Sequence, residues 1–176
     1  MREYSYMSKS LNNKEKILSG ALFFSAVVLL ASSAVFELPY EGIFQMLCAR
    51  LFTFAVLLLT RFVFKSFLLS AFASDGGFDF TVTECRAKEK ITVCRISLSN
   101  IERVCLLTDE NKKELREAAK GRKSFVYYPE MTPSVKCFVF VTECGEKLLL
   151  KLSPDETMLE ILKNAAESNQ KGGTEE

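Results

Sequence analysis

Two long apolar runs open the chain, and alternating patterns replace them near residue 73. The first run, Ile17 to Phe36, contains no charged residue. At about 1.5 Å per residue, a helix of this length measures about 30 Å, which matches the hydrocarbon core of a bilayer. The run predicts a membrane-spanning helix over 17–36. A cleaved signal peptide is the alternative, because Ser32-Ser33-Ala34 offers the small residues that a signal peptidase requires.

The second apolar run carries three cations, Arg50, Arg61 and Lys65. A span over about 45–65 places Arg50 a turn or two below one membrane surface, and it places Arg61 and Lys65 near the other surface. Long cationic side chains at such positions extend towards water. We therefore predict a second span, with these three cations at the membrane interfaces. For Arg50, a buried ion or substrate site is the alternative.

The distribution of charge predicts which way the two helices point. The connector, residues 37–42, holds Pro39, Gly42 and two glutamates but no cation, whereas lysines and arginines flank the outer ends of both spans. Because cytoplasmic flanks carry an excess of Lys and Arg, we expect a multi-pass cell-membrane protein with both termini in the cytoplasm. The cytoplasmic N-terminal segment then covers 1–16, and the two-helix anchor covers 17–72.

Beyond a glycine-containing break at 74–77, the period of the pattern becomes two. Strands are expected at 78–82, 91–98, 101–107, 124–128, 135–142 and 147–152, arranged as consecutive hairpins. Asp109–Lys120 predicts a short exposed helix that ends at Gly121. Ser153, Pro154 and Glu156 form a capping box for a closing helix, whose apolar stripe is Met158, Ile161, Leu162 and Ala165.

These elements predict a membrane-anchored α+β fold, in which a transmembrane helical hairpin precedes a mostly antiparallel β domain with a C-terminal helix. The domain covers 73–168, and residues 169–176 are expected to be a disordered tail. This order resembles bacterial pleckstrin-homology-like domains that follow one or two membrane helices. The resemblance rests on Arg95–Val104, with its I-x-x-V strand Ile101–Val104, and on Leu152–Glu156 leading into the closing helix. It implies a PH-like roll in a bacterial inner membrane, and a scaffold or adaptor without catalytic residues.

Composition narrows the possible chemistry. The net charge is +1, which argues against a nucleic-acid partner, and the chain has no histidine, the residue most used as a general base or metal ligand. Six cysteines occur without a C-x-x-C pair, so we expect no metal and no cofactor.

The cysteines of the first predicted hairpin bear on a disulfide or redox role. Pairing Phe80 with Leu98, and Val82 with Ile96, would put Cys85 and Cys94 on opposite faces, so we expect reduced thiols rather than a bridge. A thiol redox sensor or an enzyme stays a minor alternative.

A basic cluster is the candidate binding surface, with an anionic membrane as its ligand. Its residues are Lys112, Lys113, Arg116, Lys120, Arg122 and Lys123. A solvated helix face of mixed charge is the alternative. Tyr127, Tyr128 and Met131 form a second candidate, an aromatic edge for a partner strand, with core packing as its alternative.

We thus expect a non-catalytic integral membrane protein that binds membrane lipids or an unidentified protein partner. An accessory subunit of a larger membrane complex, with Arg50 as an intramembrane contact, is the alternative. Self-association through the helical hairpin stays open.

Overall fold

The computed structural model describes residues 3–8, 13–35, 41–75, 77–86, 89–130 and 135–172. The chain divides into two compact units. The helical unit is built on Ser10–Lys65, with Pro129–Met131, and the α+β unit combines Met1–Lys9 with Ser66–Tyr128 and Thr132–Glu176. The expected connector lies largely outside the described residues, as do Met131 and the last four residues.

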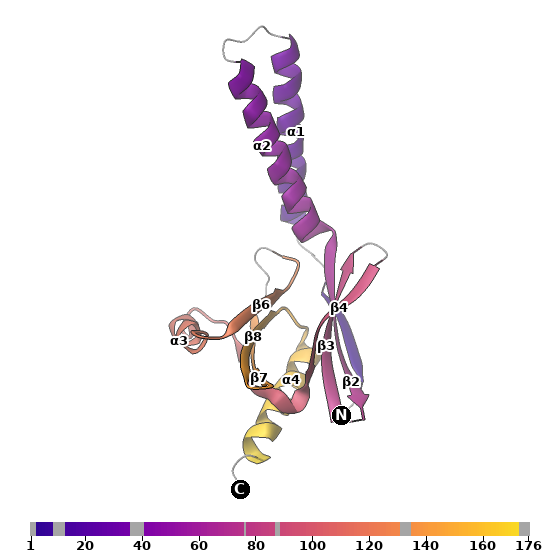
Figure 1. Ribbon diagram of the computed structural model, residues 1–176, viewed down its shortest axis with the longest axis vertical. Helices are drawn as coiled ribbons and strands as arrows, with labels where there is room; N and C mark the ends of the chain where they lie inside the picture. The colour runs from indigo at the N-terminus through magenta and orange to yellow at the C-terminus, as the bar shows by residue number, and fades with distance from the viewer. Residues whose placement is uncertain are drawn as a thin grey trace. The chain divides into compact units, whose positions relative to one another are not determined.

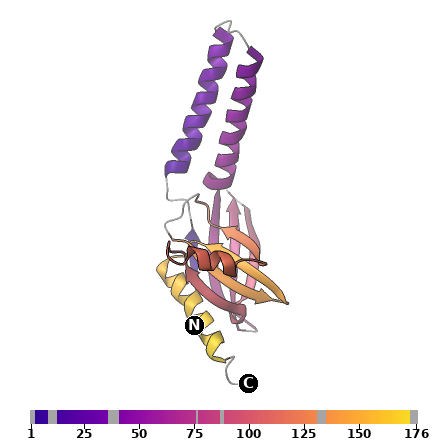
Figure 2. The ribbon, with the colours of Figure 1, turned by 90° about the vertical axis from the view of Figure 1, so that its left-hand side faces the viewer.

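Two helices lie side by side in the helical unit (Figures 1 and 2). They are α1 (Asn13–Val35) and α2 (Glu41–Leu58), and a π-helical turn, η1 (Leu59–Val63), continues α2. Small buried side chains line their contact, at Ser19 and Ala26 on α1 and at Cys48 and Ala55 on α2. Small residues let two helices approach closely without a layer of large side chains between them.

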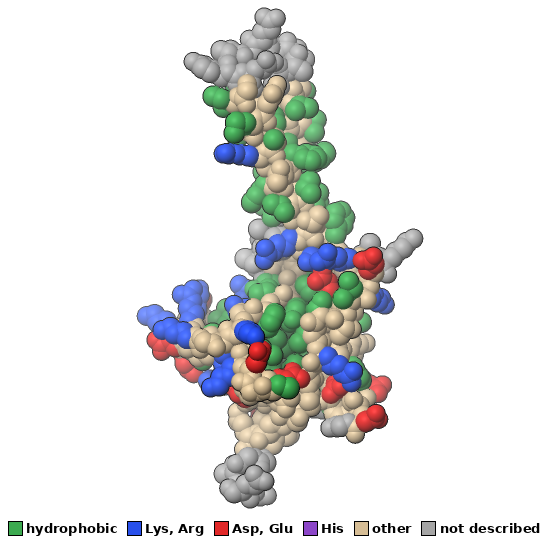
Figure 3. All heavy atoms as spheres, viewed as in Figure 1, with side chains coloured by type: hydrophobic (Ala, Val, Ile, Leu, Met, Phe, Trp, Pro, Cys, Tyr) green, Lys and Arg blue, Asp and Glu red, His purple; other side chains and the backbone are tan. Residues whose placement is uncertain are grey.

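Large apolar side chains cover the outside of this helical pair (Figure 3). Ile17 is 68% exposed and Phe24 is 69% exposed. Within the described residues, one helical stretch, Gly42–Arg61, is long and apolar enough to cross a membrane, while the apolar part of α1, Lys16–Ser32, is shorter than a span. The expectation of two spans is therefore supported directly for one helix only.

Within the described residues, the strands of the α+β unit form two four-stranded sheets, and several of these strands are labelled in Figure 1. The first sheet has the order β1 (Tyr4–Ser8), β2 (Lys65–Ser74), β3 (Gly77–Arg86), β4 (Glu89–Ser97). The second has the order β5 (Ile101–Leu106), β7 (Cys137–Glu143), β8 (Glu146–Leu152), β6 (Lys123–Tyr127). A 3-10 turn, η2 (Leu98–Asn100), connects the sheets. The expected α+β class with a C-terminal helix is confirmed.

In the sequence, the helical pair lies between β1 and β2, two strands that are hydrogen-bonded to each other. β1 and β2 are antiparallel neighbours, with Tyr4 opposite Ala71 and Ser8 opposite Phe67. The expected boundaries at 16 and 72 are therefore wrong, because the N-terminal segment contributes a strand and residues 65–72 belong to the sheet. Phe67, Leu69 and Ala71 are buried in the domain core.

The β3–β4 hairpin is confirmed, but its predicted register is wrong. Phe80 pairs with Ile96 and Val82 with Cys94, two residues away from the expected pairing, and a bulge follows Val82. The predicted break at 74–77 is the turn from β2 to β3 within one sheet, rather than a boundary between domains.

The second sheet overturns the expectation of consecutive hairpins. β6 pairs with β8 in parallel, whereas β8 is antiparallel to β7, and β7 is antiparallel to β5. β5 and β6 therefore run in the same direction at opposite edges, and such strands need a crossover connection. Residues 107–122 supply it and include α3 (Lys112–Ala118), which is close to the predicted short helix. The predicted turn after β7 is confirmed, since Cys144 and Gly145 both have positive φ, as a two-residue hairpin loop requires.

The C-terminal helix α4 (Glu156–Gly172) closes a core shared by both sheets. The predicted stripe is confirmed: Met158, Leu162 and Ala165 are buried, and Ile161 is partly buried against the same core. The predicted capping box is wrong, because the Asp155 side chain is the cap: its Oδ1 accepts the Met158 N–H at 3.1 Å.

The expected disordered tail is wrong for residues 169–172, which continue α4. The Asn169 side-chain amide donates to the carbonyls of Leu98 and Ile101, each at 2.9 Å. The end of α4 is thereby attached to η2 and to the start of β5.

Candidate functional site

Helix α3 carries three of the six candidate cations, Lys112, Lys113 and Arg116, and is held on the outer face of the second sheet. Leu115 is 1% exposed and packs against Phe140 and Leu149, which are opposite each other on β7 and β8. Asn111 fixes the approach to the helix, since its side chain accepts the Thr108 N–H and donates to the Leu106 carbonyl. The remaining faces of this short helix are free to carry charge.

The structure divides the six candidate cations into two groups. Four of them are exposed or partly exposed on or beside α3, and they make no ion pair with any described residue; they are Lys112, Lys113, Arg116 and Lys120. The other two are already engaged by carboxylates. Lys123 Nζ lies 2.7 Å from Glu146 Oε1, and Arg122 Nη2 lies 2.8 Å from Glu102 Oε2.

Arg122 serves the fold rather than an exposed surface. Its side chain is 15% exposed, and its guanidinium lies 5.1 Å from the centre of the Phe140 ring. Glu102 also accepts a hydrogen bond from the Thr142 hydroxyl, and this bond, together with the Arg122 pair, lowers the pKa of the Glu102 carboxyl. Arg122, Glu102 and Thr142 thus tie the crossover to β5 and β7.

Beside this network lies a polar cavity of about 390 Å³. Its lining residues are Ser99, Asn100, Ile101, Glu102, Thr142, Asn169 and Gln170. Most of their polar groups already bond within the protein, since Glu102 is paired and Asn169 caps two carbonyls. The cavity therefore offers few free groups to a ligand.

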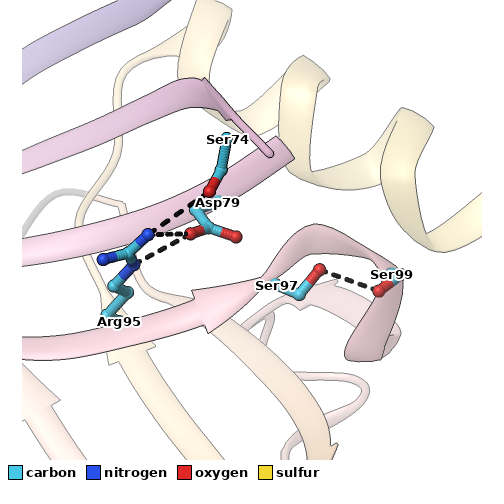
Figure 4. Close-up of polar contacts among 5 residues, drawn as sticks. All are labelled: Ser74, Asp79, Arg95, Ser97 and Ser99. Atoms are coloured by element: carbon cyan, nitrogen blue, oxygen red, sulfur yellow. Dashed lines mark hydrogen bonds and ion pairs between the residues drawn. The ribbon is translucent and has the colours of Figure 1, made fainter. Parts of the chain in front are cut away.

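A second arginine network lies on the first sheet (Figure 4). Arg95 Nε and Nη2 lie 2.8 Å and 2.6 Å from Asp79 Oδ2, and Nη2 donates to Ser74 Oγ at 3.3 Å. The Ser97 and Ser99 hydroxyls form a separate pair at 2.8 Å, and the two groups lie apart in the close-up. Arg95 thus links the ends of β2, β3 and β4.

Two of the six cysteines, Cys94 and Cys137, lie in surroundings that make a thiol unreactive. All six are free, and burial raises the pKa of Cys94 and raises that of Cys137 to about 12. A raised pKa keeps a thiol protonated and slow to react. Cys94 lies opposite Val82 and Cys85 opposite Lys90, so the expected absence of a bridge holds in the observed register. No three potential metal ligands come together within the described residues.

Of the predicted aromatic edge, Tyr127 belongs to the core. It is 8% exposed and contacts the Phe67 ring edge-on, with 5.9 Å between the ring centres. Sequence reasoning missed the apolar side chains that precede it on β6, an edge strand: Phe125 is 40% exposed and Val126 is 46% exposed. Burial does not alternate along β6, so the strand pattern of the sequence did not reveal that these two side chains are exposed.

The three predicted interface cations fall on different elements. Arg61 lies in η1, Lys65 begins β2, and Arg50 is exposed in the middle of α2. The stretch Gly42–Arg61 places Arg50 eight residues from one end and eleven from the other, or about 12 Å and about 17 Å. The predicted position near a membrane surface does not fit these bounds. A cation at the centre of a span costs about 2.5–3.5 kcal/mol on insertion scales.

Comparison of the chain with protein-family models, curated proteins and solved structures found no match. The interpretation of this site therefore depends on its residues and geometry.

Proposed function

We propose that this chain is a two-span membrane protein whose α+β domain is a non-catalytic binding module on the cytoplasmic side. The pairing of β1 with β2 carries the proposal. Ser8 and Phe67 are opposite each other in one sheet, so they occupy the same compartment. A chain that leaves and re-enters one compartment crosses the membrane an even number of times. If α2 crosses, as its length and apolar surface allow, α1 crosses as well.

Charge supports the cytoplasmic orientation. The rings of Phe23 and Phe52 lie 5.5 Å apart, so α1 and α2 are aligned with Lys16 near the level of Leu59. Lysines and arginines therefore flank the start of α1 and the end of η1 in the sequence, while the sequence that connects α1 with α2 contains Glu37 and Glu41. The positive-inside rule then favours a cytoplasmic domain.

Three observations favour binding over catalysis. The chain has no histidine, burial raises the thiol pKa of Cys94 and of Cys137, and the carboxylates Asp79 and Glu102 are paired with arginines. The resemblance to bacterial PH-like domains points the same way. A scaffold or adaptor held at an inner membrane fits these features.

The binding surface that we propose is the basic face of α3, and its ligand is an anionic lipid surface. Lys112 and Arg116 lie four residues apart and share one side of the helix, next to Lys113. Near an anionic leaflet, each such cation adds about 1 kcal/mol of attraction. Asp109, Glu110 and Glu117 offset part of this charge, so the attraction depends on how the cations face the lipid.

A protein partner on the edge strand β6 is the second candidate. Phe125 and Val126 are exposed there, and β6 is paired on one side only, with β8. An extended segment can add to such an edge through main-chain hydrogen bonds.

Cysteine labelling of the full chain in sealed vesicles tests the topology. Cys144 is exposed in the domain and serves as a natural reporter, and Glu3→Cys and Glu37→Cys are placed in a Cys144→Ser background. In vesicles with the cytoplasmic side inward, an impermeant maleimide is expected to label only Glu37→Cys until detergent is added. Labelling of position 3 and Cys144 from opposite sides would contradict the parity argument.

Lipid contact is tested in the same full chain, with a fluorophore on Glu117→Cys in the Cys144→Ser background and quenchers on the lipid head groups. Quenching is expected to rise when anionic lipid replaces zwitterionic lipid, and to fall with salt. Replacing Lys112, Lys113, Arg116 and Lys120 by Gln should abolish the difference, while Lys123→Gln, a cation paired with Glu146, is the matched control. Equal quenching in both lipids would favour the protein partner instead.

A further inference from the structure

We propose that the face of α2 around Arg50 binds a membrane helix of another protein, and that this helix carries an aspartate or glutamate near the middle of the bilayer. The inference rests on the proposed crossing of α2 and adds the chemistry of a partner. Three observations lead to it. They are the depth of Arg50 in the proposed span, the face of α2 on which Arg50 lies, and the lack of acidic residues near Arg50 in the sequences of the two helices.

Two independent alignments place Arg50 near the middle of the proposed membrane span. Within the apolar stretch Gly42–Arg61 it lies close to the centre. The Phe23–Phe52 contact sets Arg50 level with Ser25, near the midpoint of Ile17–Val35. The span cannot slide towards β2, since Phe67 is buried in the domain core and paired with Ser8. The distance from Arg50 to either end of the span exceeds the length of an arginine side chain.

Arg50 points away from α1. The contact with α1 uses Cys48 and Ala55, which are buried, whereas Arg50 lies about 200° around the helix from Cys48. On its own face, Met46 is 60% exposed, Phe54 is 54% exposed and Leu57 is 58% exposed. The helical pair therefore presents one cation within an apolar surface, and no described residue forms an ion pair with it.

A second copy of this chain cannot neutralise that cation. Between Ile17 and Thr60 the acidic residues are Glu37 and Glu41, which in the sequence lie between α1 and α2 or at the first residue of α2, nine or more residues from Arg50. Contact between two identical α2 faces would also bring two Arg50 side chains together, and like charges repel strongly at low dielectric. Lipid phosphates lie at the membrane surfaces, away from mid-depth. A carboxylate on a foreign helix meets the requirement and can accept two parallel hydrogen bonds from a guanidinium.

A designed helix provides the probe. The full-length protein is reconstituted in phosphatidylcholine vesicles with a donor fluorophore on Glu41→Cys in the Cys144→Ser background. Synthetic 20-residue Leu/Ala helices carry an acceptor and, at the tenth position, Asp, Asn or Leu. We expect the Asp helix to associate at least about ten-fold more tightly than the Leu helix. Arg50→Leu should remove this preference, and Arg61→Leu, a cation at the end of the span, should retain it. Arg50→Asp should reverse the preference, towards a probe that carries Arg.

Equal association of the Asp and Leu helices, or an Asp preference that survives Arg50→Leu, overturns the inference. Energy transfer between copies of the protein that depends on Arg50 also overturns it, since a second copy would then satisfy the cation. Separate labelling of Glu37→Cys in the Cys144→Ser background and of Cys144 in the unaltered chain, both in the same kind of vesicle, keeps the two proposals apart. If both positions are labelled from one side, α2 does not cross the membrane and both proposals are wrong. If they are labelled from opposite sides and the Asp helix does not bind, only the proposed partner is wrong.

Discussion

The helical pair and the α+β domain place the same apolar side chains in opposite positions. Phe24 on α1 is 69% exposed and Phe80 on β3 is 0% exposed; Leu57 on α2 is 58% exposed and Leu150 on β8 is 0% exposed. In the domain, large side chains fill the core. In the helical pair, small side chains form the contact and large ones face outward. A soluble protein rarely exposes an apolar surface of this kind, and the contrast is compatible with the proposed membrane around the helical pair.

Two arginines, Arg122 in the domain and Arg50 on the helical pair, differ in the same way. Arg122 is mostly buried in the domain, where Glu102 accepts its hydrogen bond. Arg50 is exposed on the helical pair, where described acidic partners are absent. The domain therefore pairs its inward cation with a carboxylate of its own, although Arg122 Nη1 is buried without a hydrogen bond to a described residue. The helical pair has no such ion pair for Arg50 among the described residues.

Excision of the domain gives the largest expected effect and tests whether its core is independent of the helices. Residues 3–8 joined by Asn-Gly to residues 67–172 should fold as a soluble monomer, because Ser8 and Phe67 already face each other as the ends of a two-residue hairpin do. Residues 75–172 alone should be unfolded, since Phe67, Leu69 and Ala71 are missing from the core. Circular dichroism and sedimentation distinguish the two. A folded 75–172 would show that β1 and β2 are dispensable.

A matched pair of leucines tests the contrast in exposure directly. In the full chain, Leu150→Ala should lower the domain's free energy of unfolding by about 2–5 kcal/mol, because it leaves a cavity in the core. Leu57→Ala makes the same chemical change on the outside of α2 and should leave the domain's stability unchanged. Pulse labelling of the buried Cys137 in increasing denaturant measures both. Equal losses would mean that Leu57 is also part of a water-excluded core.

The start of α4 offers a smaller effect. Asp155→Ala should cost about 0.5–2 kcal/mol, as is usual for loss of an N-cap side chain. Asp155→Asn keeps an accepting oxygen and should restore most of that stability. Tyr4→Phe removes the hydroxyl that donates to Asp155 and should cost less than Asp155→Ala. Thermal unfolding of the excised domain measures all three, and a full loss with Asn would assign the effect to the Asp155 charge instead.

The smallest effect concerns pH. The pKa of Glu102 is lowered in the folded domain, chiefly by Thr142 and also by Arg122. A carboxyl with a depressed pKa stabilises the fold above its unfolded pKa, about 4.3, and this stability disappears as the pH falls through the folded value. Glu102→Gln should therefore flatten the acid side of the stability profile below about pH 4.5. An unchanged profile would assign acid sensitivity to other carboxylates.

Local patterns predicted the elements whose partners are close in sequence. The β3–β4 and β7–β8 hairpins, the short helix α3 and the buried stripe of α4 all follow from periodicity and turn residues. β1 could not be predicted, because its five residues pair with a strand on the far side of two helices. Most of β2 was assigned to the two-helix anchor, 17–72, although beyond the predicted span, since Phe67, Leu69 and Ala71 continue an apolar run.

The errors at the candidate sites have the same cause. Arg50 seemed close to a surface only as long as the span extended to Lys65, which in fact begins β2. Arg122 resembled a surface cation because its partner Glu102 lies twenty residues earlier. Ser153 was chosen as the cap of α4, but Leu152 is still paired with Cys137, so the chain turns into the helix only at Asp155.

The pairing of β1 with β2 has a consequence for how the protein is made. Ser8 leaves the ribosome 59 residues before Phe67, which at about 5–20 residues per second is a wait of about 3–12 s. During that time both helices are synthesised, and β1 has no strand to join. The Tyr4 hydroxyl on β1 stays without its acceptor for longer, since Asp155 is synthesised 151 residues later. On the proposed two-span topology, the first sheet is therefore completed only after both helices have emerged and residues 8 and 67 are on the same side of the membrane. A chain that inserted only one helix would hold β1 and β2 apart, expose the core and become a target for proteolysis.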